Sequence, residues 1–187
     1  TRILSIEVTL LLDWFWPAAL GAPASDKIRA SFIAAWSPLF ATVLAGPTGW
    51  LLRDYHSPNL IALDNRPPPR NVGVIDFQDA MTGPPAYDLV SLLQDARVDV
   101  STDIESACLA RYVDAVSRLE SAFDATQFRV AYAVLGAQRT TKILGIFARL
   151  AKRDGKRQYL AHMPRLFDYL NRNLQHPELV DLRAWYD

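Results

Sequence analysis

Two short apolar segments, separated by a proline-rich turn, most restrict how this chain can fold. Residues 60–63 read Leu-Ile-Ala-Leu, residues 72–75 read Val-Gly-Val-Ile, and three consecutive prolines lie between them. Short runs with β-branched residues, bounded by turn-forming residues, are typical of strands. A single connection rich in turn formers lets two such strands return antiparallel. The segment therefore predicts a small antiparallel β-hairpin.

Most of the remaining sequence has helical periodicity, with apolar residues recurring three or four positions apart. Ser25 is a plausible N-cap, and the Thr102–Glu105 and Asp124–Gln127 segments resemble capping boxes. Helices are expected over residues 3–15, 25–44, from 84 onward, 102–119, 124–151 and 159–174, with a short one after them. The predicted fold is mainly α with one small antiparallel β-hairpin.

Polar side chains gather at both ends of the expected hairpin. Asp54 and Asn59 precede its first strand, five positions apart, and Asp76 directly follows its second strand. Phosphoryl transfer needs a carboxylate that orients the attacking hydroxyl, and oxygen ligands that hold Mg²⁺ against the nucleotide phosphates. A kinase-type site supplies these groups in this order and spacing. A polar turn that merely caps two strands remains the alternative interpretation.

Three segments around this hairpin resemble the aminoglycoside phosphotransferase and choline kinase superfamily, whose catalytic loop reads His-Gly-Asp-x-His-x-x-Asn. They are Leu52–Leu60, Val74–Ala80 and Gly83–Leu89. Within that superfamily these three segments, together with Ser91–Asp99, are most similar in sequence to the bacterial kinases that phosphorylate the anomeric hydroxyl of N-acetylmuramate and N-acetylglucosamine. The resemblance implies the C-terminal lobe of a protein-kinase-like fold. Leu52 departs from the pattern, since the family has a supporting histidine there.

The resemblance also implies a role for each matching residue. Asp54 would be the catalytic base, and Asn59 and Asp76 would bind Mg²⁺. His56 and Asp88 would support the catalytic loop structurally. Four more polar residues are candidates for substrate contacts, namely Arg53, Asp79, Arg97 and Arg139. The expected cofactors are ATP and Mg²⁺.

The resemblance further implies a division of the chain, with an N-terminal nucleotide-binding lobe expected outside it. Residues 1–49 would be a helical linker with the first helices, residues 50–80 the catalytic loop and metal-binding hairpin, and residues 84–187 a helical subdomain. No Gly-rich phosphate loop or strand-borne lysine is evident, so no nucleotide-contacting residue is predicted here. The fragment alone is expected to be inactive, and an uncovered apolar face could let it self-associate.

Composition limits the other function classes. Lys+Arg and Asp+Glu number 20 each, so no net field favours nucleic acid or an anionic membrane. The apolar residues 3–20 are interrupted by Glu7, Asp13 and Pro17, which argues against a membrane span. A single cysteine, Cys108, excludes a disulfide within the chain and suits a cytoplasmic setting.

Two classes of function remain open at this point. The first is a small-molecule kinase, acting on a cell-wall amino sugar or on another small alcohol such as an aminoglycoside or choline. The second is a non-catalytic kinase-like binding module. Retention of Asp54, Asn59 and Asp76 together favours the first.

Overall fold

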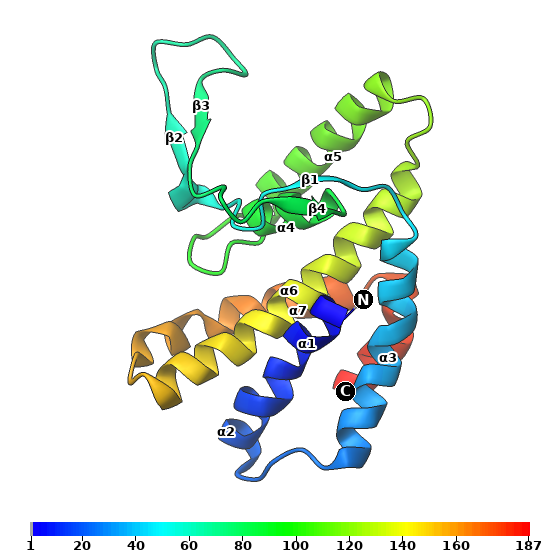
Figure 1. Cartoon of the computed structure of the whole chain (residues 1–187), viewed down its shortest axis with the longest axis vertical. Coiled ribbons are helices and arrows are strands. Elements are labelled where there is room, and N and C mark those ends of the chain that lie inside the picture. The colour runs from blue at the N-terminus through cyan, green and yellow to red at the C-terminus, as the bar shows by residue number, and fades with distance from the viewer. Residues whose placement is uncertain (1) are drawn as a thin grey trace.

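The computed structural model describes residues 2–187 and is mainly helical, with two small antiparallel sheets (Figure 1). This confirms the predicted fold class, while the second sheet was not predicted. The helices are α1 Arg2–Leu10, η1 Leu11–Phe15, α2 Trp16–Leu20, α3 Asp26–Leu44, η2 Ser57–Asn59, α4 Ala86–Leu93, α5 Thr102–Leu119, α6 Ala125–Arg153, η3 Arg157–His162, α7 Met163–Leu174, η4 Pro177–Leu179 and α8 Val180–Tyr186. The strands are β1 Gly49–Leu51, β2 Leu60–Ala62, β3 Val72–Val74 and β4 Met81–Gly83.

The N-terminal helix is longer than its periodicity predicts. A π-helical segment, η1, joins α1 directly to α2, so the helical backbone continues past Phe15 to Leu20. Pro17 does not end it, because it lies at the start of α2 directly after the π-helical segment η1, where the regular hydrogen-bond pattern of the helix is already interrupted. Gly21 then ends the helix in the left-handed conformation.

Side-chain caps fix the start of three helices. The Ser25 hydroxyl accepts the N–H of Ile28 and the Asp124 carboxylate accepts two first-turn N–H groups, as the sequence predicts. The prediction for α5 is wrong by one residue, because Ser101 and not Thr102 is the N-cap. The carboxylate of Glu105, assigned to that capping box, is instead buried in the interior.

The longest helix, α6, is the central element of the core. It runs diagonally through the molecule and packs against α1, η1, α4 and α7 (Figure 1). The closest approach is at Gly145, where a Cβ atom would overlap the backbone carbonyl of Leu10. Leu12 and Leu144 are fully buried near this crossing. The N-terminal helix is thereby fixed against α6.

A buried hydrogen-bond network joins α4, α5, α6 and α7. Nε2 of Gln94 donates to Oε1 of Glu105 at 2.8 Å, and the Tyr132 hydroxyl donates to the same oxygen at 2.8 Å. The amides of Gln94 and Asn173 exchange hydrogen bonds of 3.1 and 2.8 Å. Arg172 pairs with the second oxygen of Glu105 at 2.8 Å. Because these buried groups are hydrogen-bonded or ion-paired to one another, the network favours one packing arrangement of these helices.

The two sheets bring the polar segments together. In the predicted hairpin, β2 pairs with β3 so that Leu60 lies opposite Val74. The second sheet pairs β1 with β4, with Leu51 opposite Met81. This pairing holds the residues after β1 next to those after β3. The hairpin projects beyond the helices, whereas β1 and β4 lie over α4 (Figure 1).

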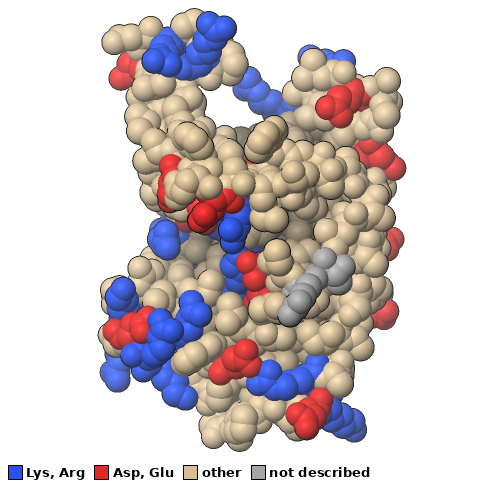
Figure 2. Space-filling model, viewed as in Figure 1, with Lys and Arg blue, Asp and Glu red and all other residues tan. Residues whose placement is uncertain are grey.

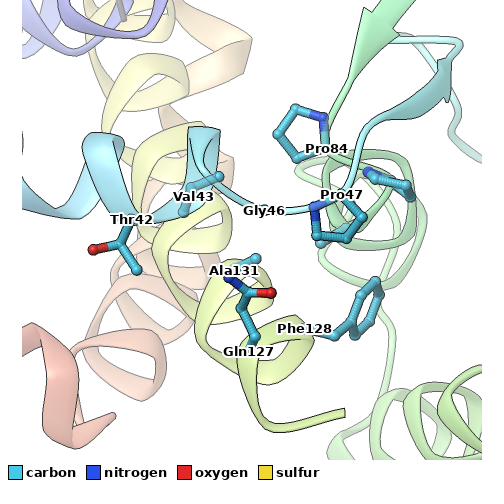
Figure 3. Close-up of a pocket in the computed structure, with 10 residues that line it drawn as sticks. Thr42, Val43, Gly46, Pro47, Pro84, Gln127, Phe128 and Ala131 are labelled. Carbon is cyan, nitrogen blue, oxygen red and sulfur yellow. The ribbon is translucent and has the colours of Figure 1, made fainter. Parts of the chain in front are cut away.

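The loop from α3 to β1 packs over the start of α4 and the first turns of α6. A cavity of about 20 Å³ remains there, and Figure 3 shows its lining residues around Gly46 and Pro47. Such a volume holds about one water molecule. This pocket is therefore a packing defect and not a ligand site.

One helical stretch, Ile3–Leu20, is long and apolar enough to cross a membrane by length and composition alone. Length and composition therefore do not decide the prediction that Glu7, Asp13 and Pro17 argue against a membrane span. In the structure, Val8, Leu11 and Leu12 are buried in the common core, and Glu7 forms an ion pair with Lys142 of α6. Ile3 and Ile6, by contrast, are each 58% exposed.

The crossing of α1 and α6 gives a first prediction. Gly145→Ala should lower the free energy of unfolding, because an overpacking cost of about 1–3 kcal/mol exceeds the roughly 1 kcal/mol that alanine gains over glycine in a helix. Urea denaturation of the 187-residue chain measures this change. The control is Gly49→Ala, where the nearest atom to a new Cβ lies 3.4 Å away. Equal or greater stability of Gly145→Ala would contradict the close crossing.

Candidate active site

The candidate site begins in the loop between β1 and β2, where the backbone adopts an unfavourable conformation. Within residues 2–187, two non-glycine residues have positive φ, Arg53 at 70° and Asp76 at 60°. Such conformations are costly for side chains with a Cβ and persist only where surrounding contacts enforce them. One precedes Asp54 and the other directly follows β3, so both strained positions lie at the predicted catalytic groups.

The carboxylate of Asp88 holds the first strained position in place. Its two oxygens accept the backbone N–H groups of Leu52 and Arg53, at 2.6 and 3.0 Å. Burial raises the pKa of Asp88, while these two N–H groups and the charge of Arg139 oppose the rise. This is the supporting contact that the resemblance implies for Asp88. It links α4 directly to the loop that carries Asp54.

Asn59 connects the loop to the end of β3. Its Nδ2 donates to the backbone carbonyl of Asp54 at 2.9 Å and to Oδ2 of Asp76 at 3.4 Å. The backbone N–H of Ile75 donates to the Asn59 carbonyl at 3.0 Å, which fixes β3 beside it. Asn59 is buried, and the hydrogen bonds of its amide within residues 2–187 are made by Nδ2 and not by Oδ1. The three predicted residues therefore meet at one place.

Two residues after Asp76 behave differently from one another. Nε2 of Gln78 donates to Oδ1 of Asp76 at 2.6 Å, a contact that the sequence analysis did not predict. The available sequence signal for this contact was the short spacing between Asp76 and Gln78. Asp79, predicted as a possible substrate residue, is exposed in the turn before β4 and lines none of the clefts described below.

A cleft beside Asp54 collects several of the predicted residues. We call it the acceptor cleft; it has a volume of about 140 Å³. Figure 2 shows acidic and basic side chains gathered in the hollow between the strands and the helices. The lining residues are Asp54, His56, Asp95, Ala96, Arg97, Arg139, Lys142, Ile143, Ile146 and Phe147. The cleft therefore unites Asp54, His56, Arg97 and Arg139, but not Arg53.

His56 stiffens the loop through its backbone. Its N–H donates to the carbonyl of Asp54 at 3.1 Å, and its carbonyl accepts the N–H of Asn59 at 2.9 Å. The imidazole Nδ1 is buried and has no hydrogen-bond partner within residues 2–187. A bracing role for the ring itself therefore stays a prediction.

Arg139 and Lys142 lie on α6, but neither is a solvated surface residue. Lys142 donates to Glu7 at 2.8 Å and to the Tyr87 hydroxyl at 3.1 Å, while Gln138 donates to the other oxygen of Glu7. Burial opposes the charge on Lys142, but Tyr87 and Glu7 raise its pKa overall. The sequence signal for this ion pair was Glu7, a single acidic residue inside an apolar helix. Without knowledge of its partner Lys142, Glu7 looks only like an interruption of the apolar pattern of that helix.

A second hollow, of about 390 Å³, lies on the other side of this ion pair and is mostly apolar. Arg53 and Glu7 line it together with Leu44, Leu51 and Met81. Arg53 therefore lies apart from the other predicted substrate residues.

No cluster of three or more His, Cys, Asp or Glu side chains suited to a metal occurs in the described part of the chain.

The sequence profile described as the phosphotransferase enzyme family matches residues 8–130. This span covers the loop, the hairpin and α4, where the contacts above occur. The chain belongs to this family. The resemblance inferred from the loop and hairpin motifs is thereby confirmed.

Curated relatives narrow the comparison within the phosphotransferase family. The chain is 46% identical over 158 residues to the N-acetylmuramate/N-acetylglucosamine kinase of Caulobacter vibrioides. The matched region covers 84% of the chain and 42% of that kinase. The kinase of the same name from Neisseria meningitidis is 36% identical, and the match covers 95% of the chain and 53% of that kinase. The one from Pseudomonas putida is 35% identical, and the match covers 96% of the chain and 52% of that kinase. The chain thus spans about half the length of the curated relatives it matches.

The Asp88 contact gives a second prediction. Asp88→Asn should leave one loop N–H without an acceptor, because an amide offers a single oxygen where the carboxylate offered two. Amide hydrogen exchange at Leu52 and Arg53 should accelerate, and stability should fall by about 1–3 kcal/mol. The control is Asp64→Asn, in the exposed proline-rich turn. Unchanged protection of both amides in Asp88→Asn would show that Asp88 does not hold the loop.

Proposed function

We propose that the protein containing this chain is an ATP-dependent kinase of N-acetylmuramate and N-acetylglucosamine, and that it phosphorylates the anomeric hydroxyl. The observation that carries the proposal is the Asn59 amide, which contacts both the Asp54 carbonyl and the Asp76 carboxylate. This contact brings the Asp54 backbone, the Asn59 side chain and the Asp76 carboxylate together, which supports a site with Asp54 as base and Asn59 and Asp76 as metal ligands. The names of the relatives supply the acceptor sugars.

In this mechanism Asp54 orients the acceptor hydroxyl and takes its proton as the oxygen attacks the γ-phosphorus of ATP. The bond from that phosphorus to the bridging oxygen breaks, and ADP leaves. Asp54 is exposed and lines the acceptor cleft, so a sugar hydroxyl can reach it. The strained Arg53 backbone, fixed by Asp88, sets the direction of the Asp54 side chain.

Asn59 and Asp76 fit a magnesium ion. Mg²⁺ prefers oxygen donors and is usually held by one or two protein groups together with water and phosphate oxygens. The Asn59 Oδ1 and the Asp76 carboxylate would supply such a set, with the Asn59 Nδ2 keeping its hydrogen bond to the Asp54 carbonyl and giving up its 3.4 Å contact with Asp76 Oδ2. When bound, the ion would neutralise charge on the transferred phosphate. The hydrogen bond from Gln78 Nε2 to Asp76 Oδ1 would either persist or break on binding of the ion.

A nucleotide-binding lobe is the further partner that the proposal requires. The chain spans about half of each relative, and the described residues show no Gly-rich phosphate loop. The exposed Ile3 and Ile6 and the apolar hollow beside them are suited to contact such a lobe. Without it, the same surface would favour association of the isolated chain with itself.

The first functional test is a substrate panel with the full-length protein. With ATP and Mg²⁺, N-acetylmuramate and N-acetylglucosamine should be phosphorylated, and choline and an aminoglycoside should not. Asp54→Asn should lower kcat by about 10²–10⁴-fold, the usual contribution of general base catalysis. The matched control is Asp168→Asn, an exposed carboxylate on α7.

The outcomes separate the competing functions. Activity on choline or an aminoglycoside alone would assign another small-alcohol kinase. No activity on any acceptor, despite Mg²⁺-dependent nucleotide binding, would favour a non-catalytic binding module. Undiminished turnover by Asp54→Asn would remove Asp54 from the mechanism.

A further inference from the structure

Arg139 is a buried cation without an ionic partner. It lies in the middle of α6, is 9% exposed, and lines the acceptor cleft. Its Nε has no hydrogen-bond partner, and no carboxylate within residues 2–187 forms an ion pair with it. A charge removed from water without a partner is strongly unfavourable. Arg139 has no ion-pair partner of its own in the described residues, and its guanidinium can therefore take an anion that enters the cleft.

The neighbouring groups do not neutralise this guanidinium. The Tyr87 ring centroid lies 5.7 Å from its Cζ, which gives a weak cation–π contact. Asp88 is near, but both of its oxygens already accept backbone N–H groups. Lys142, one turn further along α6, is paired with Glu7. Arg139 therefore keeps its donors for a group that enters the cleft.

The same cleft also offers acceptors for hydroxyl groups. Asp54 lies in its wall, and Oδ2 of Asp95 is buried without a hydrogen-bond partner in the described chain. The other Asp95 oxygen accepts the backbone N–H of Arg97 at 2.8 Å, so its side chain is fixed. Carboxylates accept hydrogen bonds from hydroxyls, whereas a guanidinium pairs best with a carboxylate or phosphate. A polyhydroxy ligand with one anionic group satisfies both.

The anion is assigned to the acceptor and not to the nucleotide. The cleft that Arg139 lines contains Asp54 but neither Asn59 nor Asp76, which form the proposed metal pair. Metal-bound phosphates would lie beside that pair, and the acceptor would approach Asp54 from the cleft. Arg97 also lines the cleft, but it is exposed and gains less from pairing than a buried cation.

We propose that Arg139 binds the carboxylate of N-acetylmuramate and so determines how the kinase discriminates between its two sugars. N-acetylmuramate is N-acetylglucosamine with a lactyl ether on O3, and that ether ends in a carboxylate. The two sugars have the same ring substituents except at O3. Arg139 recognises the one charged group in which they differ. This inference rests on the proposed function.

The test measures kcat/KM of the full-length protein for both sugars. Arg139→Gln should lower kcat/KM for N-acetylmuramate by about 10- to 100-fold, mainly through KM, as expected for losing a charge-assisted hydrogen-bonded pair. The value for N-acetylglucosamine should change less than about threefold, because that sugar brings no anion. Arg139→Lys should restore part of the loss. Arg129→Gln, an exposed arginine on the same helix, is the matched control.

A second arm needs no mutation and remains valid if Arg139→Gln fails to fold. The methyl ester of N-acetylmuramate keeps the shape of the acid but removes its charge. The unmodified protein should prefer the acid over the ester. Equal use of acid and ester by the unmodified protein would overturn the inference.

The remaining outcomes distinguish the two proposals. Equal loss for both sugars in a folded Arg139→Gln protein would make Arg139 a structural residue and overturn the inference alone. Phosphorylation of neither sugar by the unmodified protein would overturn the proposed function, and the inference with it.

Discussion

The candidate site depends on one interaction, the acceptance of two backbone N–H groups by the Asp88 carboxylate. These hydrogen bonds, of 2.6 and 3.0 Å, hold the loop after β1 against α4. They compensate the strained backbone of Arg53 and thereby direct Asp54 toward the cleft. Asp88 itself lies on a short helix that α6 supports. The reactive loop is thus anchored through a helix to the core.

Local patterns in the sequence predicted much of this arrangement. The hairpin, the N-caps Ser25 and Asp124, and the order of Asp54, Asn59 and Asp76 all follow from neighbours a few residues apart. Such features depend on turn chemistry and short-range hydrogen bonds, which a single sequence displays. The family resemblance then supplied the roles.

Contacts between distant residues could not be predicted in this way. Glu7 meets Lys142, and Gln94 meets Asn173, through helices that pack only in the folded chain. The pairing of β1 with β4 joins two three-residue strands that carry no clear alternation. The burial of Arg139 depends on which face of α6 turns inward. A charged residue on a long helix reads as solvated until that face is known.

Charge is distributed unevenly over the site. One side of the Glu7–Lys142 ion pair is a mostly apolar hollow, and the other is the acceptor cleft with its aspartates and arginines. The ion pair joins α1 to α6 between these two surfaces. The structure thus separates an apolar surface, assigned in the proposal to another lobe, from a polar cleft, assigned there to a sugar. The length of the chain and its fold alone would not show that one of these surfaces is apolar and the other polar.

Phosphorus NMR of the reaction product tests the central claim most directly. The full-length protein, given ATP, Mg²⁺ and N-acetylglucosamine, should form ADP and a sugar phosphate whose phosphorus couples to the anomeric proton. That coupling places the phosphate on the anomeric oxygen. Phosphate on any other sugar oxygen would contradict the proposed acceptor position. Release of inorganic phosphate alone would contradict the kinase function itself.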